Sequence, residues 1–200
     1  ARPGFTASES AVYRLCKKIK ASAPPEVFVR IETAPGDVAQ VDFGEVRALI
    51  DPATQTLRRT WVFTMVLAWS RHHVVEFVFD QTLTTGRLCH QHAFEFFGGV
   101  PKRIVIDNLK AAIIRAYTQD HEAEVTRAYA ECAEHYGFLI DPCLPVHPRH
   151  KGKVERGGVQ SVQQSLVPLL ESDTTLPEAN AQARTWVLGK AGLRIHGTTH

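Results

Sequence analysis

The sequence predicts an α/β protein built on a mixed five-stranded sheet that is flanked by helices. Three successive runs rich in β-branched and aromatic residues are joined by short connections, which is typical of antiparallel strands. Two short apolar runs then alternate with helical patterns, as parallel strands do with their crossover helices. The chain has 200 residues, 44% of them hydrophobic and 22% charged, so it can bury a core of ordinary size.

The chain begins with a predicted helix over residues 6–20, where Thr6 and Glu9 fit a capping box. Its apolar positions follow a helical stripe, and basic residues, among them Lys17 and Lys18, occupy the other faces. Two interpretations fit this pattern equally: the last helix of a DNA-binding module, or an amphipathic surface helix. The net charge of +2 favours neither, because it is too small to indicate a nucleic-acid binder by itself.

The antiparallel part of the sheet is predicted from three runs of strand-forming residues. The runs are residues 38–43, which residues 44–50 continue or pair with, and then residues 59–68 and 72–79. An Asp-Pro pair at 51–52 marks a turn after the first run, and a short connection joins the last two. These features predict an antiparallel meander.

The second half of the chain alternates predicted helices with short strands. The predicted strands are 103–106 and 138–140, and the predicted helices are 84–97, 121–136, one from about 151, and 176–188. The helix over 84–97 has a predicted apolar face that consists of Leu88, His92, Ala93 and Phe96. This order predicts crossover connections and therefore a parallel part of the same sheet.

Three acidic residues stand at positions where ordinary packing does not account for them well. Asp42 lies inside a strand, where aspartate is disfavoured, and Asp107 directly follows a buried strand. Glu155 heads a helical stripe that faces the core and continues through Val159, Val162, Leu166 and Leu169. Each acid also has an ordinary explanation, respectively a paired core acid, a helix cap and a surface ion pair with Lys151. Glu45 is the acid most easily confused with a site residue, because it lies three positions from Asp42.

Together the three acids predict a site for divalent cations. Three carboxylates in one pocket would repel one another and take up protons unless cations offset their charge. Mg²⁺ binds a few carboxylates together with water and phosphate oxygens, and two ions about 3.5–4 Å apart promote attack on a phosphodiester. Basic residues beside Glu155 would then neutralise the phosphates of the substrate, which explains an acid inside a basic run. That run contains Arg149, Lys151, Lys153 and Arg156.

The segments around the three acids resemble the DDE motif of retroviral-integrase-like catalytic cores. They read QVDFGE at Asp42, VIDNLK at Asp107 and HKGKVER at Glu155, and they are most similar to insertion-sequence transposases of the IstA type. The segment RIHGTT at 194–199 also matches that group, so the resemblance covers about residues 35–200. It implies a ribonuclease-H-like fold with helical arms at both ends, and a fragment of a longer protein.

The resemblance implies a polynucleotidyl transferase that cuts at transposon ends and joins 3′-hydroxyls to target DNA. Asp42, Asp107 and Glu155 would be the catalytic residues and would hold two Mg²⁺ ions, for which Mn²⁺ can substitute. It also implies homo-multimers on DNA, an AAA+ ATPase helper, no membrane partner, and a location at the nucleoid in a bacterial cytoplasm. The residues expected to bind nucleic acid are Lys17, Lys18, Asn108, Lys110, Arg149, Lys151, Lys153 and Arg156.

The same interpretation divides the chain into three regions. Residues 1–34 are the end of a DNA-binding helical region and a linker, residues 35–175 are the catalytic core, and residues 176–200 are a helical extension that the sheet does not need. The alternative functions are a ribonuclease-H-like nuclease and a non-catalytic DNA-binding scaffold. A zinc site is discounted, although Cys132 with His135 and Cys143 with His147 have ligand-like spacing.

Overall fold

The computed structural model describes residues 33–106, 113–115, 124–142 and 158–193, together with Ser10 and Arg14. The chain divides into two compact units, residues 1–30 and 31–200. In the first unit, Ser10 and Arg14 are helical, and the Nε of Arg14 donates a hydrogen bond of 3.2 Å to the Ser10 carbonyl. The rest of the predicted helix over 6–20 lies outside the described residues.

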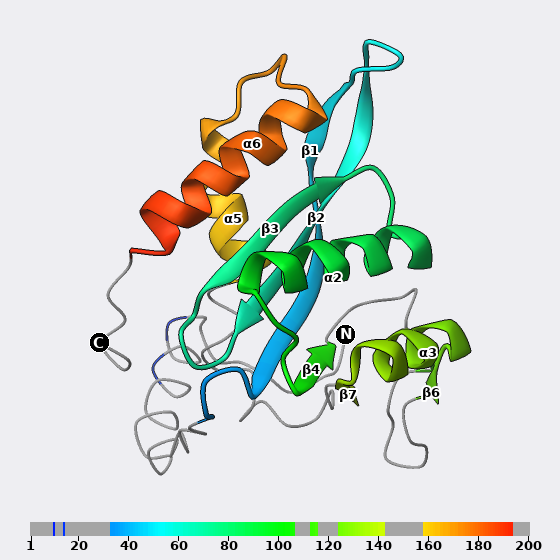
Figure 1. Cartoon of the computed structure of the whole chain (residues 1–200). Coiled ribbons are helices and arrows are strands. Elements are labelled where there is room, and N and C mark those ends of the chain that lie inside the picture. Colours follow the sequence, from blue (N-terminus) through cyan, green and yellow to red (C-terminus); the bar gives the residue numbers. More distant parts are fainter. Residues whose placement is uncertain are drawn as a thin grey trace, which may run out of the picture. The chain divides into compact units, whose positions relative to one another are not determined.

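The second unit contains the predicted mixed sheet, with five strands in the order β3-β2-β1-β4-β7 (Figure 1). The strands are β1 (Val38–Asp51), β2 (Thr56–Leu67), β3 (His73–Val78), β4 (Arg103–Ile106) and β7 (Leu139–Pro142). The first three form an antiparallel meander, whereas β4 pairs in parallel with both β1 and β7. β1 is therefore the central strand, and it joins the antiparallel part of the sheet to the parallel part.

The first strand, β1, extends beyond the predicted run over residues 38–43, because residues 44–51 continue it. Its pairing with β2 is irregular between Val46 and Leu49, and the strand ends in a turn at Asp51. The Asp51 carboxylate accepts the backbone N–H of Ala53 at 2.9 Å and binds Arg58 at 3.0 Å. These contacts fix the hairpin, so the residues after Phe43 extend the strand.

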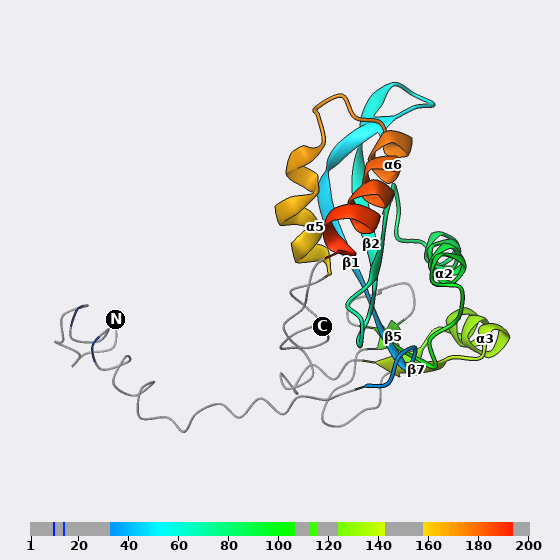
Figure 2. The ribbon, with the colours of Figure 1, turned by 60° about the vertical axis from the view of Figure 1, so that its left-hand side comes forward.

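Helices cover both faces of the sheet, with α5 and α6 on one side and α2 and α3 on the other (Figure 2). Their bounds are α2 (Leu83–Phe97), α3 (Arg127–Tyr136), α5 (Val159–Ser165) and α6 (Leu176–Trp186), with a 3-10 turn at Val167–Leu169 and a π turn at Val187–Ala191. None of the helices described here has the length and apolarity needed to cross a bilayer. The second unit is thus a three-layer arrangement with a separate apolar core on each face of the sheet.

The predicted helix over 121–136 begins later than expected. Residues Glu124–Val125 form a short strand, β6, that pairs with β5 (Ile113–Arg115), and α3 begins only at Arg127. Thr126 takes the extended conformation at the N-cap position, where threonine is favoured. Strand pairing therefore overrides the helical pattern at Glu124 and Val125.

The apolar face predicted for α2 is wrong for Leu88 and His92, although Ala93 is buried and Phe96 packs against the core. Leu88 is 49% exposed, and the side chain of His92 is 43% exposed, whereas His90 is fully buried. The buried residues of the helix are Gly86, Cys89, His90, Ala93 and Phe94. Two helical stripes overlap in this sequence, and the buried one is selected by contacts with α3 that lie far along the chain.

The C-terminal helix α6 packs against the sheet and contributes to the core of that face, although residues 176–200 add no strand to the sheet. Ala179 and Ala183 of α6 are fully buried, and Trp186 is 7% exposed, within the apolar cluster that covers β3. The N–H of Ile50 on β1 also donates to the Thr174 carbonyl at 3.1 Å, just before α6 begins. The stripe predicted to run from Val159 to Leu169 also ends early. α5 stops at Ser165 and a 3-10 turn follows, so Leu169 is exposed and Leu170 is buried instead.

A buried histidine joins α2 to α3 on the opposite face. The Nδ1 of His90 lies 2.7 Å from the Gly86 carbonyl, and its Nε2 lies 3.0 Å from the Tyr129 hydroxyl. A carbonyl can only accept, so Nδ1 carries the proton and Nε2 accepts from the tyrosine. Burial lowers the pKa of His90 to about 4, and the ring is therefore neutral near pH 7.

We expect His90 to make the fold sensitive to acid. An unfolded histidine titrates near pH 6.5, so between that pH and about 4 the unfolded state binds more protons than the native state. The free energy of unfolding should fall by about 3 kcal/mol over this range as the pH decreases. A double variant, His90→Phe with Tyr129→Phe, leaves no buried hydroxyl unpaired and should lack this loss. Urea titrations at several pH values measure the difference, and parallel pH profiles for the two proteins would contradict the assignment.

Candidate active site

Asp42 lies in the middle of β1 and is half-buried. Side chains alternate between the two faces of a strand, and Val41 and Phe43 point into the core beneath α2 and α3. Asp42 and Gly44 therefore share the other face, which α5 covers. Across the sheet Asp42 is paired with Thr64 of β2, whose Oγ1 is 3.5 Å from the Asp42 carbonyl oxygen.

The parallel pairing of β1 with β4 ends beside this residue. The register pairs Val38 with Arg103 and continues to Val41 with Ile106. In the sequence, the next residues after that last pair are Asp42 and Asp107. The structure describes Asp42, and Asp107 lies outside the described residues.

The start of α5 lies against β1 and β2, close to Asp42. A Cβ atom built on Gly44 would overlap the Cγ1 atom of Val159, the first residue of α5. A Cβ atom built on Gly158, the N-cap residue, would lie 3.4 Å from the Oγ1 atom of Thr64. Glu155 precedes Gly158 by three residues in the sequence and lies outside the described part of the chain.

The other residues predicted for the site cannot be placed in the same way. Those outside the described residues are Lys17, Lys18, Asn108, Lys110, Arg149, Lys151, Lys153 and Arg156, and also Cys143 and His147 of the discounted zinc pattern. Within the part that is described, no three His, Cys, Asp or Glu side chains are grouped so that they could hold a metal ion. Cys132 is buried in the core, and burial raises the pKa of its thiol.

Glu45 is separated from the predicted site although it is close to Asp42 in sequence. It lies on the opposite face of β1 and forms two hydrogen bonds with the guanidinium of Arg59, at 2.8 and 2.5 Å. Arg59 in turn lies over the ring of Trp61, 4.6 Å from its centroid. The hydrogen bond from Arg59 lowers the pKa of Glu45. Its carboxylate is thus engaged in a structural ion pair.

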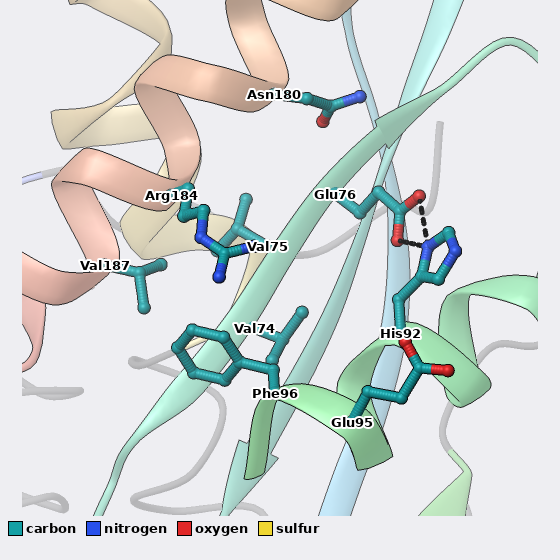
Figure 3. A pocket seen from close by; sticks show the side chains of 9 residues that line it. All are labelled: Val74, Val75, Glu76, His92, Glu95, Phe96, Asn180, Arg184 and Val187. Atoms are coloured by element: carbon teal, nitrogen blue, oxygen red, sulfur yellow. Dashed lines mark hydrogen bonds and ion pairs between the residues drawn. The ribbon is translucent and has the colours of Figure 1, made fainter. Parts of the chain in front are cut away.

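A second feature, which the sequence did not predict, is an open cavity of about 460 Å³ beside the edge strand β3 (Figure 3). It is lined by Val74, Val75, Glu76, His92, Glu95, Phe96, Asn180, Arg184 and Val187. In the cavity both carboxylate oxygens of Glu76 lie 3.1 Å from the Nδ1 atom of His92 (Figure 3). The acids predicted for catalysis do not line it.

Asn180 of α6 closes part of the free edge of β3. Its Oδ1 accepts the backbone N–H of Phe77 at 2.7 Å, and its Nδ2 donates to the Phe77 carbonyl at 3.0 Å. An edge strand leaves such backbone groups unpaired on one side, where another strand could add. The side-chain amide therefore takes the place of a neighbouring strand at this residue.

We expect Asn180→Ala to destabilise the fold by about 1–3 kcal/mol, because both backbone groups of Phe77 lose their partner. Asn180→Asp is a matched control, since it keeps an acceptor for the Phe77 N–H but has no N–H to donate. Its free energy of unfolding should lie between those of the wild type and the alanine variant. Urea unfolding measures all three proteins, and equal stabilities would show that the clamp contributes nothing.

Comparison with known proteins adds family information to this geometry. Residues 32–148 match the integrase core domain family. The chain is 38% identical to a candidate transposase, Rv3428c, of Mycobacterium tuberculosis (96% of this chain, 46% of that protein). It is also 34% identical to the transposase for insertion sequence element IS232 of Bacillus thuringiensis subsp. berliner (64% of this chain, 30% of that protein). The chain thus spans less than half the length of these relatives.

Solved structures agree with the fold. The HTLV-2 integrase catalytic core domain in complex with magnesium, in its trimeric form, superposes with a TM-score of 0.53 at 14% identity (84% of this chain, 94% of that chain). A chain of the simian T-cell lymphotropic virus intasome, determined with the PP2A regulatory subunit B56 gamma, gives 0.55 at 19% identity (85% and 53%). The mixed five-stranded sheet flanked by helices is therefore the ribonuclease-H-like fold that the motifs implied.

Proposed function

The chain belongs to the integrase core domain family, and on that premise we propose that it is the catalytic core of a DNA transposase of the IstA type. In this proposal it cuts at transposon ends and joins the resulting 3′-hydroxyls to target DNA. The relatives named for insertion sequences support the transposase assignment, and they include the transposase of IS21 from Pseudomonas aeruginosa at 27% identity over 96% of this chain (47% of that protein).

The pairing around Asp42 is the observation that most supports this mechanism. Asp107 follows Ile106 directly, and Ile106 is paired with the neighbour of Asp42 on the adjacent strand. Glu155 is three residues from Gly158, and a chain of three residues spans at most about 11 Å. These short connections support the proposal that both acids lie near Asp42.

The proposed donors suit a hard divalent cation. Aspartate and glutamate carboxylates are the ligands that Mg²⁺ and Mn²⁺ share, and Asp42 is held in the central strand of a hydrogen-bonded sheet. When bound, two such ions would polarise the phosphodiester and stabilise the leaving oxygen. In this proposal Asp42, Asp107 and Glu155 hold the ions. A rigid strand also limits the motion of its carboxylate, as precise positioning requires.

The basic residues have a different role in the proposal. Arg149, Lys151, Lys153 and Arg156 would bind the phosphates of the DNA strand and hold it in line with the carboxylates. Asn108, Lys110, Lys17 and Lys18 are proposed to contact DNA farther along. We also propose that the protein acts as a homo-multimer on DNA with an AAA+ ATPase helper, in the bacterial cytoplasm at the nucleoid.

We expect Asp42→Asn, Asp107→Asn and Glu155→Gln each to abolish most end cleavage and strand transfer. Each substitution keeps the size of the side chain and removes a charge that the metal ions require. Double variants should be little worse than single ones, because residues that act as a unit are strongly non-additive. Glu45→Gln is the matched control and should retain activity, since Glu45 binds Arg59 on the opposite face.

Assays with pre-cut 3′-hydroxyl ends distinguish the proposed activity from the alternatives. A transposase joins these ends to target DNA, a nuclease only hydrolyses DNA, and a scaffold binds it without reaction. Normal joining by Glu155→Gln would remove that residue from the site.

We expect replacement of Lys151, Lys153 and Arg156 by alanine to weaken DNA binding with little dependence on sequence. Each lost phosphate contact should reduce the slope of log K against log salt concentration by about 0.9. Binding measured by fluorescence anisotropy across a salt series tests this. An unchanged slope would mean that these side chains are solvated and do not contact phosphate.

A further inference from the structure

We propose that Thr64 is a positioning residue for Asp42, and that its buried hydroxyl group serves this role. The hydroxyl holds Asp42 in the orientation in which its carboxylate binds the divalent ions. This inference rests on the proposed function, because it takes Asp42 as a metal ligand. Thr64 acts through Asp42 and is assigned no contact of its own with the metal ions or the DNA.

Thr64 lies directly beside Asp42 in the sheet. The two residues are paired in the antiparallel register of β1 and β2, and both side chains are on the face that α5 covers. Residues opposite each other in such a pair have Cβ atoms about 4.5–5.5 Å apart, so their side chains are neighbours. The hydroxyl is turned toward β1, because its Oγ1 lies 3.5 Å from the Asp42 carbonyl oxygen. A polar atom of β2 is therefore placed against the proposed ligand.

Packing does not require a hydroxyl group at this position. Thr64 is 1% exposed, and its neighbours on the same face are valines, namely Val62 and Val66 along β2 and Val75 opposite it on β3. A valine would fill the same space with no polar atom. Burial of a hydroxyl among apolar side chains costs free energy unless the group is well hydrogen-bonded. The surrounding core therefore does not explain why this residue is threonine.

The hydrogen bonds of the fold do not explain the hydroxyl either. Among the described residues, it makes one hydrogen bond, to the Asp42 carbonyl, and 3.5 Å is long for a bond that usually measures about 2.5–3.0 Å. Thr60, on the same face of β2, has a clear structural role. Its Oγ1 accepts the N–H of Leu49 at 3.1 Å and donates to the Arg58 carbonyl at 2.9 Å. Thr64 makes no comparable contribution, which leaves its hydroxyl for Asp42.

The side chain of Thr64 is held in a fixed position. It is β-branched, which restricts rotation about χ1. The backbone of Gly158 at the start of α5 lies close to the hydroxyl, since a Cβ atom built there would be 3.4 Å from Oγ1. β2 is also paired with a strand on each edge. A hydroxyl fixed in this way can orient a neighbouring residue, because it does not move when that residue does.

The effect on metal binding follows from the short covalent path within Asp42. The carbonyl that Thr64 contacts and the carboxylate proposed to bind metal belong to the same residue. Groups that orient a metal ligand typically lower metal affinity or activity about 10–100-fold when they are removed. Thr64→Val keeps the shape of the side chain and removes the hydroxyl, so Mn²⁺ affinity and strand transfer should each fall by about tenfold or more. The free energy of unfolding should stay the same or rise, because a poorly bonded buried hydroxyl is replaced by a methyl group.

The test uses the complete natural protein with Thr64→Val, Thr64→Ser and Thr60→Val. Thr64→Ser keeps the hydroxyl and removes the methyl group. Thr60→Val is the matched control, since it removes a buried hydroxyl from the same face of the same strand. Mn²⁺ affinity is measured without DNA by electron paramagnetic resonance, strand transfer with pre-cut ends, and stability by urea unfolding.

We expect Thr64→Val to lose Mn²⁺ affinity and strand transfer without losing stability, and Thr64→Ser to retain most of the Mn²⁺ affinity. Thr60→Val should lose stability alone. Normal Mn²⁺ affinity and strand transfer in Thr64→Val would overturn the inference. An equal loss of Mn²⁺ affinity in Thr64→Ser would also overturn it, because the methyl group would then be responsible. The same holds for an equal loss in Thr60→Val, which would indicate a general effect of the strand.

A second pair of variants keeps the inference open to test if Thr64→Val does not fold. Thr64→Ser and Thr64→Ala both lack the methyl group and differ in the hydroxyl, so the serine variant should bind Mn²⁺ more tightly, and equal affinities would overturn the inference. Failure of the proposed function gives a different result, in which Asp42→Asn itself leaves Mn²⁺ affinity and strand transfer unaltered. If Asp42→Asn loses both and Thr64→Val is normal, only the positioning role is overturned.

Discussion

The pairing of β1 with a neighbour on each edge is the constraint on which the rest of this structure depends. β1 pairs with β2 in antiparallel register and with β4 in parallel register. These two registers fix the face of the sheet to which each side chain of β1 points. Val41 and Phe43 fill the core under α2 and α3. A register slip of one residue would turn Asp42 into that core, where an unpaired carboxylate is costly to bury. The alternation that builds the core thus also fixes the face that carries Asp42.

The two helical layers depend on this sheet in different ways. On one face, aromatic residues and the His90–Tyr129 hydrogen bond join α2 and α3 into a closed core. On the other face, α5 has only seven residues, too few to be stable as an isolated helix. Its position must come from packing, through its buried apolar side and the contacts of its first turn with β1 and β2. The placement of α5 is therefore a property of the sheet surface.

The sequence was sufficient to predict the sheet, since strand-forming runs and the Asp51–Pro52 turn act locally. The sequence was insufficient where contacts between distant residues determine which side of a helix is buried. The buried side of α2 depends on Tyr129, which hydrogen-bonds His90 from 39 positions away. The packing of α6 gives only a weak apolar signal in the sequence, because the fully buried residues at its contact, Ala179 and Ala183, are alanines.

The site shows the same division between local and distant information. Asp42 could be found because an aspartate inside an apolar strand conflicts with local preference. Glu45 could be separated from it only once its pairing with Arg59 was known. Gly44 carries no signal in the sequence, because a glycine in a strand has several explanations. Its meaning depends on Val159, which lies 115 positions later and meets it only in the folded protein.

Asp42 and α5 differ in what determines their positions. Asp42 is fixed by hydrogen bonds on both sides of its strand. The first turn of α5 is held by side-chain packing, through the contact of Val159 with Gly44. Packing is the less rigid of the two, because it depends on the fit of single methyl groups. The contact of Val159 with Gly44 therefore sets how closely α5 lies on the face of β1 that carries Asp42.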